Sequence, residues 1–356
     1  MRRARSFPVT AAAAALAAGL ASGLATGCAG PVAQEHTWEA FGDTAVAEVF
    51  TRTAADGERA LAEIRGSVTR MEQLVDTGGT GAELAVLNRL AADSFYRVQD
   101  RDLYRCLLLA LDYARASRGA FDPTVGPLVR LYRDAAGAAP TASEVSGALG
   151  AVGWDDVLVA EEARAVRFRN AGMSLDLGGV AKGFALDVAS RVFTRTGMLA
   201  GRLQIGGNFY VWGSPLGARE WTTVIRDPRR PTTEWLSVRA ADRGIAVTAA
   251  GGERRIVIDP ATGLPPAGDV QVALAVADSG GDADALSTAL LVAGSVRGGD
   301  LLERARRVEA VLLVDGPEGP ELRLSGSLEG RVVLSPELEA EVAGRARYIL
   351  PPARLP

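Results

Sequence analysis

Apolar residues recur at helical spacing in several parts of the chain. Leu61, Ile64, Val68 and Met71 lie three or four positions apart, which predicts an amphipathic helix over residues 60–75. The same pattern, interrupted by glycines, predicts further helices over 83–90, 103–116, 141–149, 179–196, 282–292 and 301–306.

Short apolar or alternating runs predict strands, and most of them fall in the second half of the chain. A strand pair is expected within 38–51. Further strands are expected over 157–160, 166–169, 173–177, 203–205, 209–212, 222–225, 236–239, 245–248, 255–258, 270–277, 310–314 and 322–325. Because helices and strands are mixed without regular alternation, the sequence favours an α+β fold over a doubly wound sheet.

The first 28 residues resemble an export signal. A basic start is followed by an alanine- and leucine-rich stretch over 11–24, and the segment ends at Cys28 after small residues. That ending is similar to a bacterial lipoprotein processing site. We therefore expect an exported protein held at the membrane by a lipid on Cys28, on its periplasmic or extracytoplasmic face.

Residues 29–37 are then expected to form a short tether, and residues 38–350 a single domain. The only other cysteine, Cys106, lies inside the helix expected over 103–116, so we expect it to be a buried small apolar residue rather than half of a disulfide.

Composition narrows the chemistry that the chain can perform. His36, near the start of the mature chain, is the only histidine, which argues against a histidine-based triad or a His/Cys zinc site. Any metal must therefore be held by oxygen atoms. A net charge of -4 leaves no basic footprint, so we expect no nucleic-acid partner.

Lys182 is the only lysine in a chain whose other basic residues are arginines. It follows Asp176, Gly178 and Gly179 in a strand–turn–helix pattern, and backbone amides at such a helix start favour an anion, often a phosphate. Neither the G-x-G-x-x-G nor the P-loop pattern is present, since Gly183 follows the lysine. From the glycines alone, an ordinary tight turn is the favoured interpretation.

Asp284 and Thr288 lie four residues apart on an expected helix and share a face, with Ser287 adjacent. One carboxylate with hydroxyl groups makes a hard-oxygen site, and Mg²⁺ commonly uses few protein ligands. The alternative is helix capping. Capping is favoured for Asp282, whereas the two interpretations are close for Asp284.

Two further motifs are weaker. The run from Ile256 through Ile258 and Asp259 to Gly263 describes a strand that ends in a tight turn, which is mostly structural. Gly206 and Gly207 before Asn208 indicate either close approach of a ligand or a bulge.

The order of these motifs is more specific than any one of them. The motifs lie at 119–128, 176–183, 206–208, 258–263 and 284–289. Together they resemble the ApbE-type FAD:protein FMN transferases, and the resemblance runs from about residue 38 to about residue 315. It implies a T-fold-like α+β domain whose helices pack on a largely antiparallel sheet.

The resemblance also implies the chemistry. Family members bind FAD as a substrate, use Mg²⁺ at its pyrophosphate, release AMP and move FMN to a threonine hydroxyl of a partner protein, here expected at the membrane. By resemblance, Asp284, Thr288 and the Gly179 carbonyl are metal ligands, with Ser287 as a third side-chain candidate. Lys182 and Asp284 are the expected catalytic groups. The expected FAD contacts are Lys182, Asp176, Ala120, Phe121, Asp122, Gly207, Asn208 and Ile258.

The chain departs from the family pattern at several places, one of which is the Met-Gly-Thr start, here Phe41-Gly42-Asp43. Family members usually carry a histidine three residues before the Asp of the Asp-Pro turn, where this chain has Ile256, and a Thr-Ser-Gly-Asp stretch, where it has residues 249–252. These departures keep three alternatives open: an FAD pyrophosphatase, a non-catalytic FAD-binding lipoprotein, and an exported structural domain without flavin.

Overall fold

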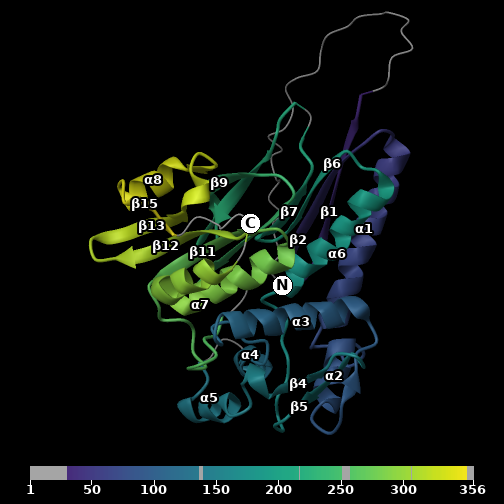
Figure 1. Ribbon diagram of the computed structural model, residues 1–356, viewed down its shortest axis with the longest axis vertical. Helices are drawn as coiled ribbons and strands as arrows, with labels where there is room; N and C mark the ends of the chain where they lie inside the picture. The colour runs from purple at the N-terminus through teal and green to yellow at the C-terminus, as the bar shows by residue number, and fades with distance from the viewer. Residues whose placement is uncertain (1–29, 136–138, 216, 251–256, 306, 351–356) are drawn as a thin grey trace, which may run out of the picture. The chain divides into compact units, whose positions relative to one another are not determined.

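A nine-stranded sheet organises the fold (Figure 1). Its order is β1-β2-β6-β7-β10-β11-β12-β13-β15, and all neighbours are antiparallel except β13 and β15. The strands are β1 (Val32–Ala40), β2 (Asp43–Thr51), β6 (Ala200–Ile205), β7 (Asn208–Trp212), β10 (Arg243–Ala249), β11 (Val270–Ala277), β12 (Glu309–Gly316), β13 (Gly319–Ser325) and β15 (Ala346–Leu350). The expected α+β class with a largely antiparallel sheet is confirmed.

This structure is a computed structural model, and it describes residues 30–135, 139–215, 217–250, 257–305 and 307–350. From Pro31 onward the chain forms one compact unit. The export signal with Cys28 lies outside the described residues. No helix within the described ranges is both long and apolar enough to cross a membrane.

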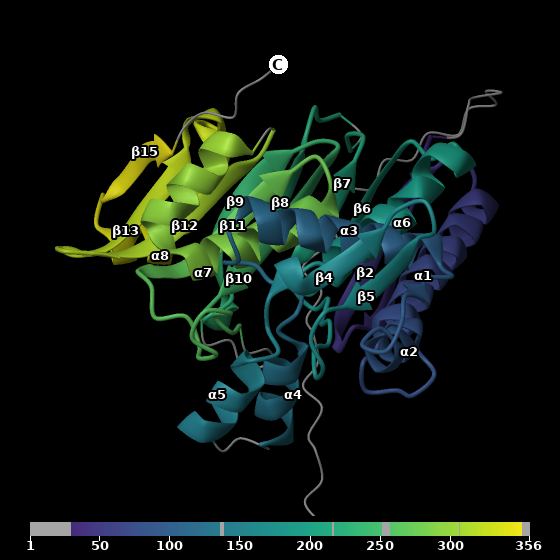
Figure 2. The same cartoon turned by 60° about the horizontal axis from the view of Figure 1, so that its bottom comes forward.

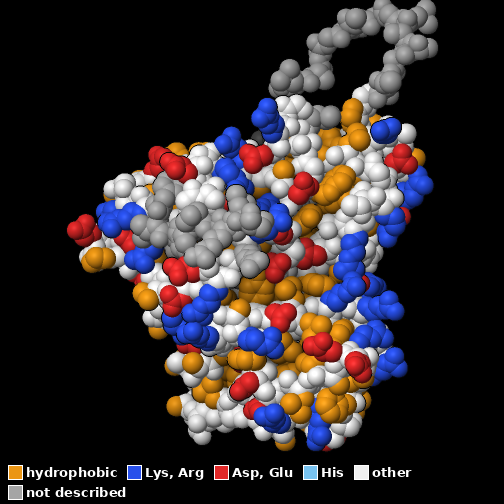
Figure 3. Space-filling view, viewed as in Figure 1, with side chains coloured by type: hydrophobic (Ala, Val, Ile, Leu, Met, Phe, Trp, Pro, Cys, Tyr) orange, Lys and Arg blue, Asp and Glu red, His pale blue; other side chains and the backbone are white. Residues whose placement is uncertain are grey.

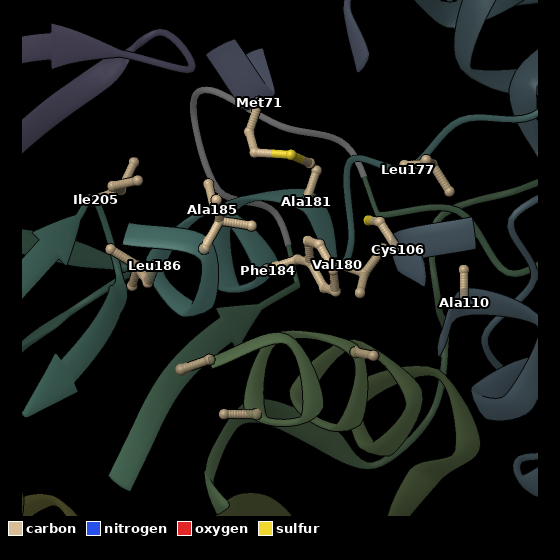
Figure 4. Close-up of a cluster of buried hydrophobic side chains, with 14 of the residues drawn as sticks. Met71, Cys106, Ala110, Leu177, Val180, Ala181, Phe184, Ala185, Leu186 and Ile205 are labelled. Atoms are coloured by element: carbon tan, nitrogen blue, oxygen red, sulfur yellow. The ribbon is translucent and has the colours of Figure 1, made fainter. Parts of the chain in front are cut away.

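Four helices pack over one face of the large sheet. They are α1 (Ala54–Val75), α3 (Arg101–Ala116), α6 (Ala181–Thr196) and α7 (Gly280–Arg304). The apolar stripes of α1 and α6 meet side chains that alternate inward from β2 and β6, such as Ala47 and Ile205. α7 packs on β10 and β11, and α3 packs on the other three helices. Figure 4 shows Met71, Phe184 and Ile205 in this core, together with Cys106, which is buried as expected.

The opposite face of the large sheet is covered by a second, three-stranded sheet. Its strands are β8 (Trp221–Asp227), β9 (Arg230–Ala240) and β14 (Val332–Leu334), in the order β14-β9-β8, followed by α8 (Pro336–Val342). The core between the two sheets includes Trp235, Val272 and Leu313. Because β11 is buried on both faces from Val272 onward, its sequence from there to Ala277 is a continuous apolar run rather than an alternating one.

Shorter elements lie below one end of the large sheet, as Figure 2 shows for α4 and α5. They are α2 (Glu83–Leu90), β3 (Tyr96–Arg97), α4 (Gly126–Asp134), α5 (Ala142–Leu149), β4 (Val157–Ala160) and β5 (Ala165–Phe168), with 3-10 turns at Trp154–Asp156 and, near the C-terminus, Gly326–Leu328. Basic side chains gather along the right-hand edge of the face in Figure 3.

The structure corrects the expected tether. Residues 32–37 lie in β1 and pair with β2 from Val32, opposite Thr51, to Thr37, opposite Val46. Partly buried and exposed positions alternate along β1, as in a strand with one covered face. The sequence prediction failed because Gln34 and His36 lie on the covered side of β1, so apolar and polar residues do not alternate along it.

Three other expected elements also differ. The run 173–177 forms no ladder strand, because the Asn88 side-chain amide hydrogen-bonds both the N–H and the C=O of Leu175 (2.8 and 2.9 Å). The expected helices 282–292 and 301–306 are the single element α7, interrupted at Gly294, where φ is 73°. Of the expected strand 255–258, residues 255 and 256 lie outside the described residues and the other two are not in a strand.

The start of α6 and the start of α7 touch backbone to backbone. A Cβ added to Gly183 would lie 2.0 Å from the Gly280 carbonyl oxygen and 2.7 Å from the Asp284 Cβ. Glycine is therefore required at this crossing, because any side chain would push the two helices apart.

We predict that Gly183→Ala lowers the free energy of unfolding by about 1–3 kcal/mol or more, since the added methyl group overpacks a backbone contact. Gly66→Ala is the matched control: its added Cβ meets nothing within 4 Å in the middle of α1, so it should be neutral or stabilising. Urea unfolding of the two variants measures both effects. A Gly183→Ala protein as stable as the wild type would contradict this packing.

Candidate active-site cleft

A cleft of about 1730 Å³ lies where the glycine turn, the first turns of α6 and α7, and the β8–β9 hairpin meet. Most of the residues that the sequence singled out line it. They are Ala120, Phe121, Asp122, Asp176, Gly179, Lys182, Gly207, Asn208, Ile258, Asp284 and Thr288. Segments up to 168 residues apart, from Ala120 to Thr288, are therefore brought to one cavity.

The expected metal ligands lie together. Asp284 and Thr288 are one turn apart on α7, and Asp284 is only 5% exposed. Gly179 packs beside them, because a Cβ added to it would lie 3.4 Å from the Thr288 Oγ1 and 2.9 Å from the Phe121 ring. A side chain at position 179 would thus displace the groups that this glycine brings close.

Asp284 is fixed from the α6 side. The Gly183 N–H donates to its Oδ2 at 3.0 Å, so this carboxylate of α7 satisfies one backbone donor in the first turn of α6. Val180, the N-cap of α6, provides no side-chain acceptor of its own. The residue next to the lone lysine is therefore bonded directly to the expected metal ligand.

Lys182 is paired across the cleft with a residue that the sequence reasoning did not assign. Its Nζ lies 3.2 Å from the Asp43 Oδ2, and its side chain is 12% exposed. Gly206, with a φ of 55°, makes room for Asp43, since an added Cβ would lie 2.7 Å from the same oxygen. The only signal for Asp43 was that a largely buried ammonium needs a carboxylate partner.

Asp122 and Asp176 line the cleft while they shape its loops. Burial raises the pKa of Asp122, although its carboxylate accepts bonds from the Thr124 N–H and hydroxyl (2.8 and 2.6 Å) and from the Trp154 N–H (3.1 Å). Asp176 accepts a bond from the Gly178 N–H at 2.8 Å. Both carboxylates therefore hold turns that face the cavity.

Ser287 is placed differently from Thr288. It is fully buried, is not among the lining residues, and donates to the Asp284 carbonyl oxygen at 2.9 Å. Its oxygen also lies 2.7 Å from the hydroxyl of Thr248, which does line the cleft. In this arrangement Ser287 supports Thr248 from behind, and sequence reasoning missed Thr248 because it sits in an ordinary apolar strand.

Asn208 carries the clearest unmet polar group of the cleft. Its side chain is 3% exposed, and its Oδ1 has no hydrogen-bond partner in the described part of the chain. Buried polar atoms are rarely left unpaired, so an orphan acceptor in a cavity indicates a ligand donor.

The described residues hold no group of three or more His, Cys, Asp or Glu side chains that could bind a metal. Ile256 lies outside the described residues.

One cleft of this α+β fold contains a pair of oxygen donors, the ammonium of the only lysine and a glycine turn. This combination is typical of the class of proteins that bind an anionic ligand, as a phosphate-binding enzyme does. Comparison with known proteins gives the family: residues 42–312 match the ApbE family. The chain belongs to the ApbE family.

Curated relatives of the chain carry the name FAD:protein FMN transferase. One from Treponema pallidum is 31% identical over 288 residues, covering 74% of this chain and 79% of the relative. Another, from Rhodobacter capsulatus, is 33% identical over 276 residues, covering 72% of this chain and 51% of the relative.

Solved structures share the fold. The ApbE protein from Thermotoga maritima has a TM-score of 0.75 at 22% identity, with 84% of this chain and 99% of that chain covered. The flavin transferase ApbE from Vibrio cholerae has a TM-score of 0.74 at 22% identity, with 84% and 100% covered.

Proposed function

We propose that the protein is an exported, Mg²⁺-dependent FAD:protein FMN transferase. In the reaction, a threonine oxygen of a partner protein bonds to the phosphorus of the FMN half, the bond from that phosphorus to the AMP half breaks, and the hydroxyl proton leaves. The observation that carries the proposal is the convergence of Asp284, Thr288, Gly179 and Lys182 on one cleft.

The donor set fits Mg²⁺. Asp284 supplies a carboxylate, Thr288 a hydroxyl and Gly179 a main-chain carbonyl, all of them hard oxygen ligands. Mg²⁺ in proteins commonly keeps several waters and is completed by substrate phosphates, so it does not require three carboxylates. When bound, the ion supplies positive charge to the diphosphate oxygens.

The cleft also fits FAD. A drug-sized ligand usually needs a pocket of about 300–1,000 Å³, and this cleft exceeds that range. The extra volume accommodates a dinucleotide together with the acceptor side chain. The start of α6 and Lys182 face an anion, Phe121 and Ile258 offer apolar surface to a ring system, and the Asn208 Oδ1 awaits a donor.

One observation favours a second candidate, an FAD pyrophosphatase or a non-catalytic FAD-binding lipoprotein. Ile256 stands where the family pattern has histidine, so the chain lacks that proton acceptor. General-base help is worth about 10²–10⁴-fold. Water is abundant in an open cleft, so hydrolysis depends less on such help than transfer to one threonine does.

A single experiment separates these functions. The full-length protein is incubated with FAD, with or without Mg²⁺, and with an acceptor domain that the Treponema pallidum relative flavinylates; a Thr→Val variant of that acceptor is the control. We expect Mg²⁺-dependent AMP release and an FMN adduct by mass spectrometry on the threonine form only. AMP without an adduct would identify a pyrophosphatase, and bound FAD without AMP would identify a binding protein.

Lys182→Arg should lower turnover even though the charge is kept. The guanidinium is planar and larger than the ammonium, and it would have to fit beside Asp43 in a largely buried place. Lys182→Met, which removes the charge, should cost on the order of 100-fold. Initial rates of AMP release measure both. If Lys182→Arg reacts at the wild-type rate, the site does not require an ammonium.

We also propose that the protein is anchored through a lipid on Cys28, on the basis of the sequence of residues 1–28. Radiolabelled fatty acid should then be incorporated into the wild-type protein and found in the membrane fraction. The Cys28→Ser variant should lose the label. Equal labelling of the two proteins would contradict the anchor.

A further inference from the structure

We propose that Asp187 is a positioning residue of this site: it holds the first turn of α7, and with it Asp284, against the first turn of α6, which carries Lys182. The catalytic part of this inference rests on the proposed function. The structural part, a coupling between two helix starts, is independent of it. Asp187 lies on α6, one turn beyond Gly183.

Asp187 binds two amides of the neighbouring helix. Its Oδ1 accepts a bond from the Gly280 N–H at 2.6 Å, and its Oδ2 accepts one from the Gly281 N–H at 2.8 Å. In return, Asp284 of α7 accepts the Gly183 N–H of α6. Each helix therefore caps the other with an aspartate side chain.

The first-turn amides of α7 are then fully accounted for. The Asp282 N–H is bonded to the Ser279 hydroxyl and the Ala283 N–H to the Ser279 carbonyl. The Gly280 and Gly281 amides depend on Asp187. Without its carboxylate these two buried donors lose their partner, and the N-terminal end of α7 loses its link to α6.

The glycines make this link specific. An added Cβ on Gly280 would lie 2.5 Å from the Gly183 carbonyl oxygen, and one on Gly281 would lie 3.1 Å from the Asp187 Oδ2. Contacts this close admit one arrangement of the helix ends. A shift of the first turn of α7 would therefore move Asp284 away from the Gly183 N–H.

The surroundings of Asp187 make an amide variant suitable as a test. Burial raises the pKa of Asp187 to about 7, against the effect of its two amide donors. Asp282 and Asp278 of the α7 start and Tyr210 of β7 lie around it, with Arg105 and Asp112 of α3 across the adjoining groove. The nearby Arg191 is bonded to Asp102. An uncharged side chain is thus tolerated, although asparagine can accept through one oxygen only.

The test compares Asp187→Asn with Asp102→Asn. Asp102 is a buried carboxylate of α3 that binds Arg70 and Arg191 away from the cleft, so its variant controls for lost stability. Hydrogen exchange of the metal-free, full-length proteins is followed by mass spectrometry. In Asp187→Asn we expect amides of both helix starts, Gly183 included, to exchange about tenfold faster, as for a lost helix cap. Asp102→Asn should leave them unchanged.

Activity provides the second measurement. The Mg²⁺ concentration for half-maximal AMP release should rise about tenfold in Asp187→Asn, with most of kcat recovered at saturating Mg²⁺, because the ligands remain but are less well placed. Asp187→Glu, which restores the charge, should recover part of the effect. Asp102→Asn should lower the melting temperature and leave the Mg²⁺ requirement unchanged.

Unchanged exchange at Gly183 in Asp187→Asn would overturn the coupling. If that variant fails to fold, Asp284→Asn tests the same link from the other side, and unchanged exchange at Gly280 and Gly281 would overturn it equally. A wild-type protein that transfers no flavin would defeat the proposed function. It would leave the exchange result standing, so the two failures are distinguishable.

Discussion

The site depends on one contact, the crossing of α6 and α7 at Gly183 and Gly280. Two helix starts meet there with no side chain between them, and each receives a carboxylate from the other. Helix starts carry unsatisfied amides and partial positive charge, so two of them side by side would repel each other. Asp187 and Asp284 offset that repulsion and link the two helix starts. The same contact places Lys182 and Asp284 at the cleft, so neither residue could be moved without the other.

In the proposed function, this arrangement lets a chain with one histidine provide positive charge to a phosphate. The positive charge comes from a largely buried ammonium, from a helix start, and in the proposed function from a metal ion held by oxygens. Asp43 pairs with the Lys182 ammonium. In the proposed function, the same ammonium would also contact the diphosphate of FAD.

Much of this fold was predictable from the sequence, and the exceptions have physical reasons. Helical spacing located α1, and the apolar run at 270–277 located β11. β1 was missed because polar residues lie on both of its sides, and α4 was not predicted because Gly126 and Pro127 open it. The spacing of Asp284 and Thr288 indicated that they share a helix face. Spacing alone could not show that the adjacent Ser287 does not line the cleft.

Partners across the fold were beyond the reach of the sequence. The contact of Thr248 is with a residue 39 positions away, that of Asp43 with one 139 positions away, and that of Asp187 with one about 93 positions away. Nothing in the neighbouring sequence marks these three residues. Ser287 was expected as a third side-chain ligand beside Thr288, but the helix directs it to Thr248 and not to the cavity. Motif order supplied what spacing could not, because it placed five segments in one known arrangement.

The two walls of the cleft are held together by different interactions, close backbone contacts in one and ion pairs in the other. The α6–α7 wall is held by glycine contacts and short amide bonds, which admit one geometry. The β8–β9 wall is held by charges: burial opposes ionisation of Asp227, but hydrogen bonds from Arg229 and Arg230 keep its pKa low, and Glu341 of α8 binds both arginines. Ion pairs near solvent tolerate small shifts and weaken with salt. In the proposed function, the α6–α7 wall suits the bond-breaking chemistry and the charged wall suits entry of the acceptor protein. Glu341 lies beyond residue 312, where the match to the family ends. Through Glu341, the C-terminal segment thus contributes an ion-pair partner to the two arginines of the charged wall.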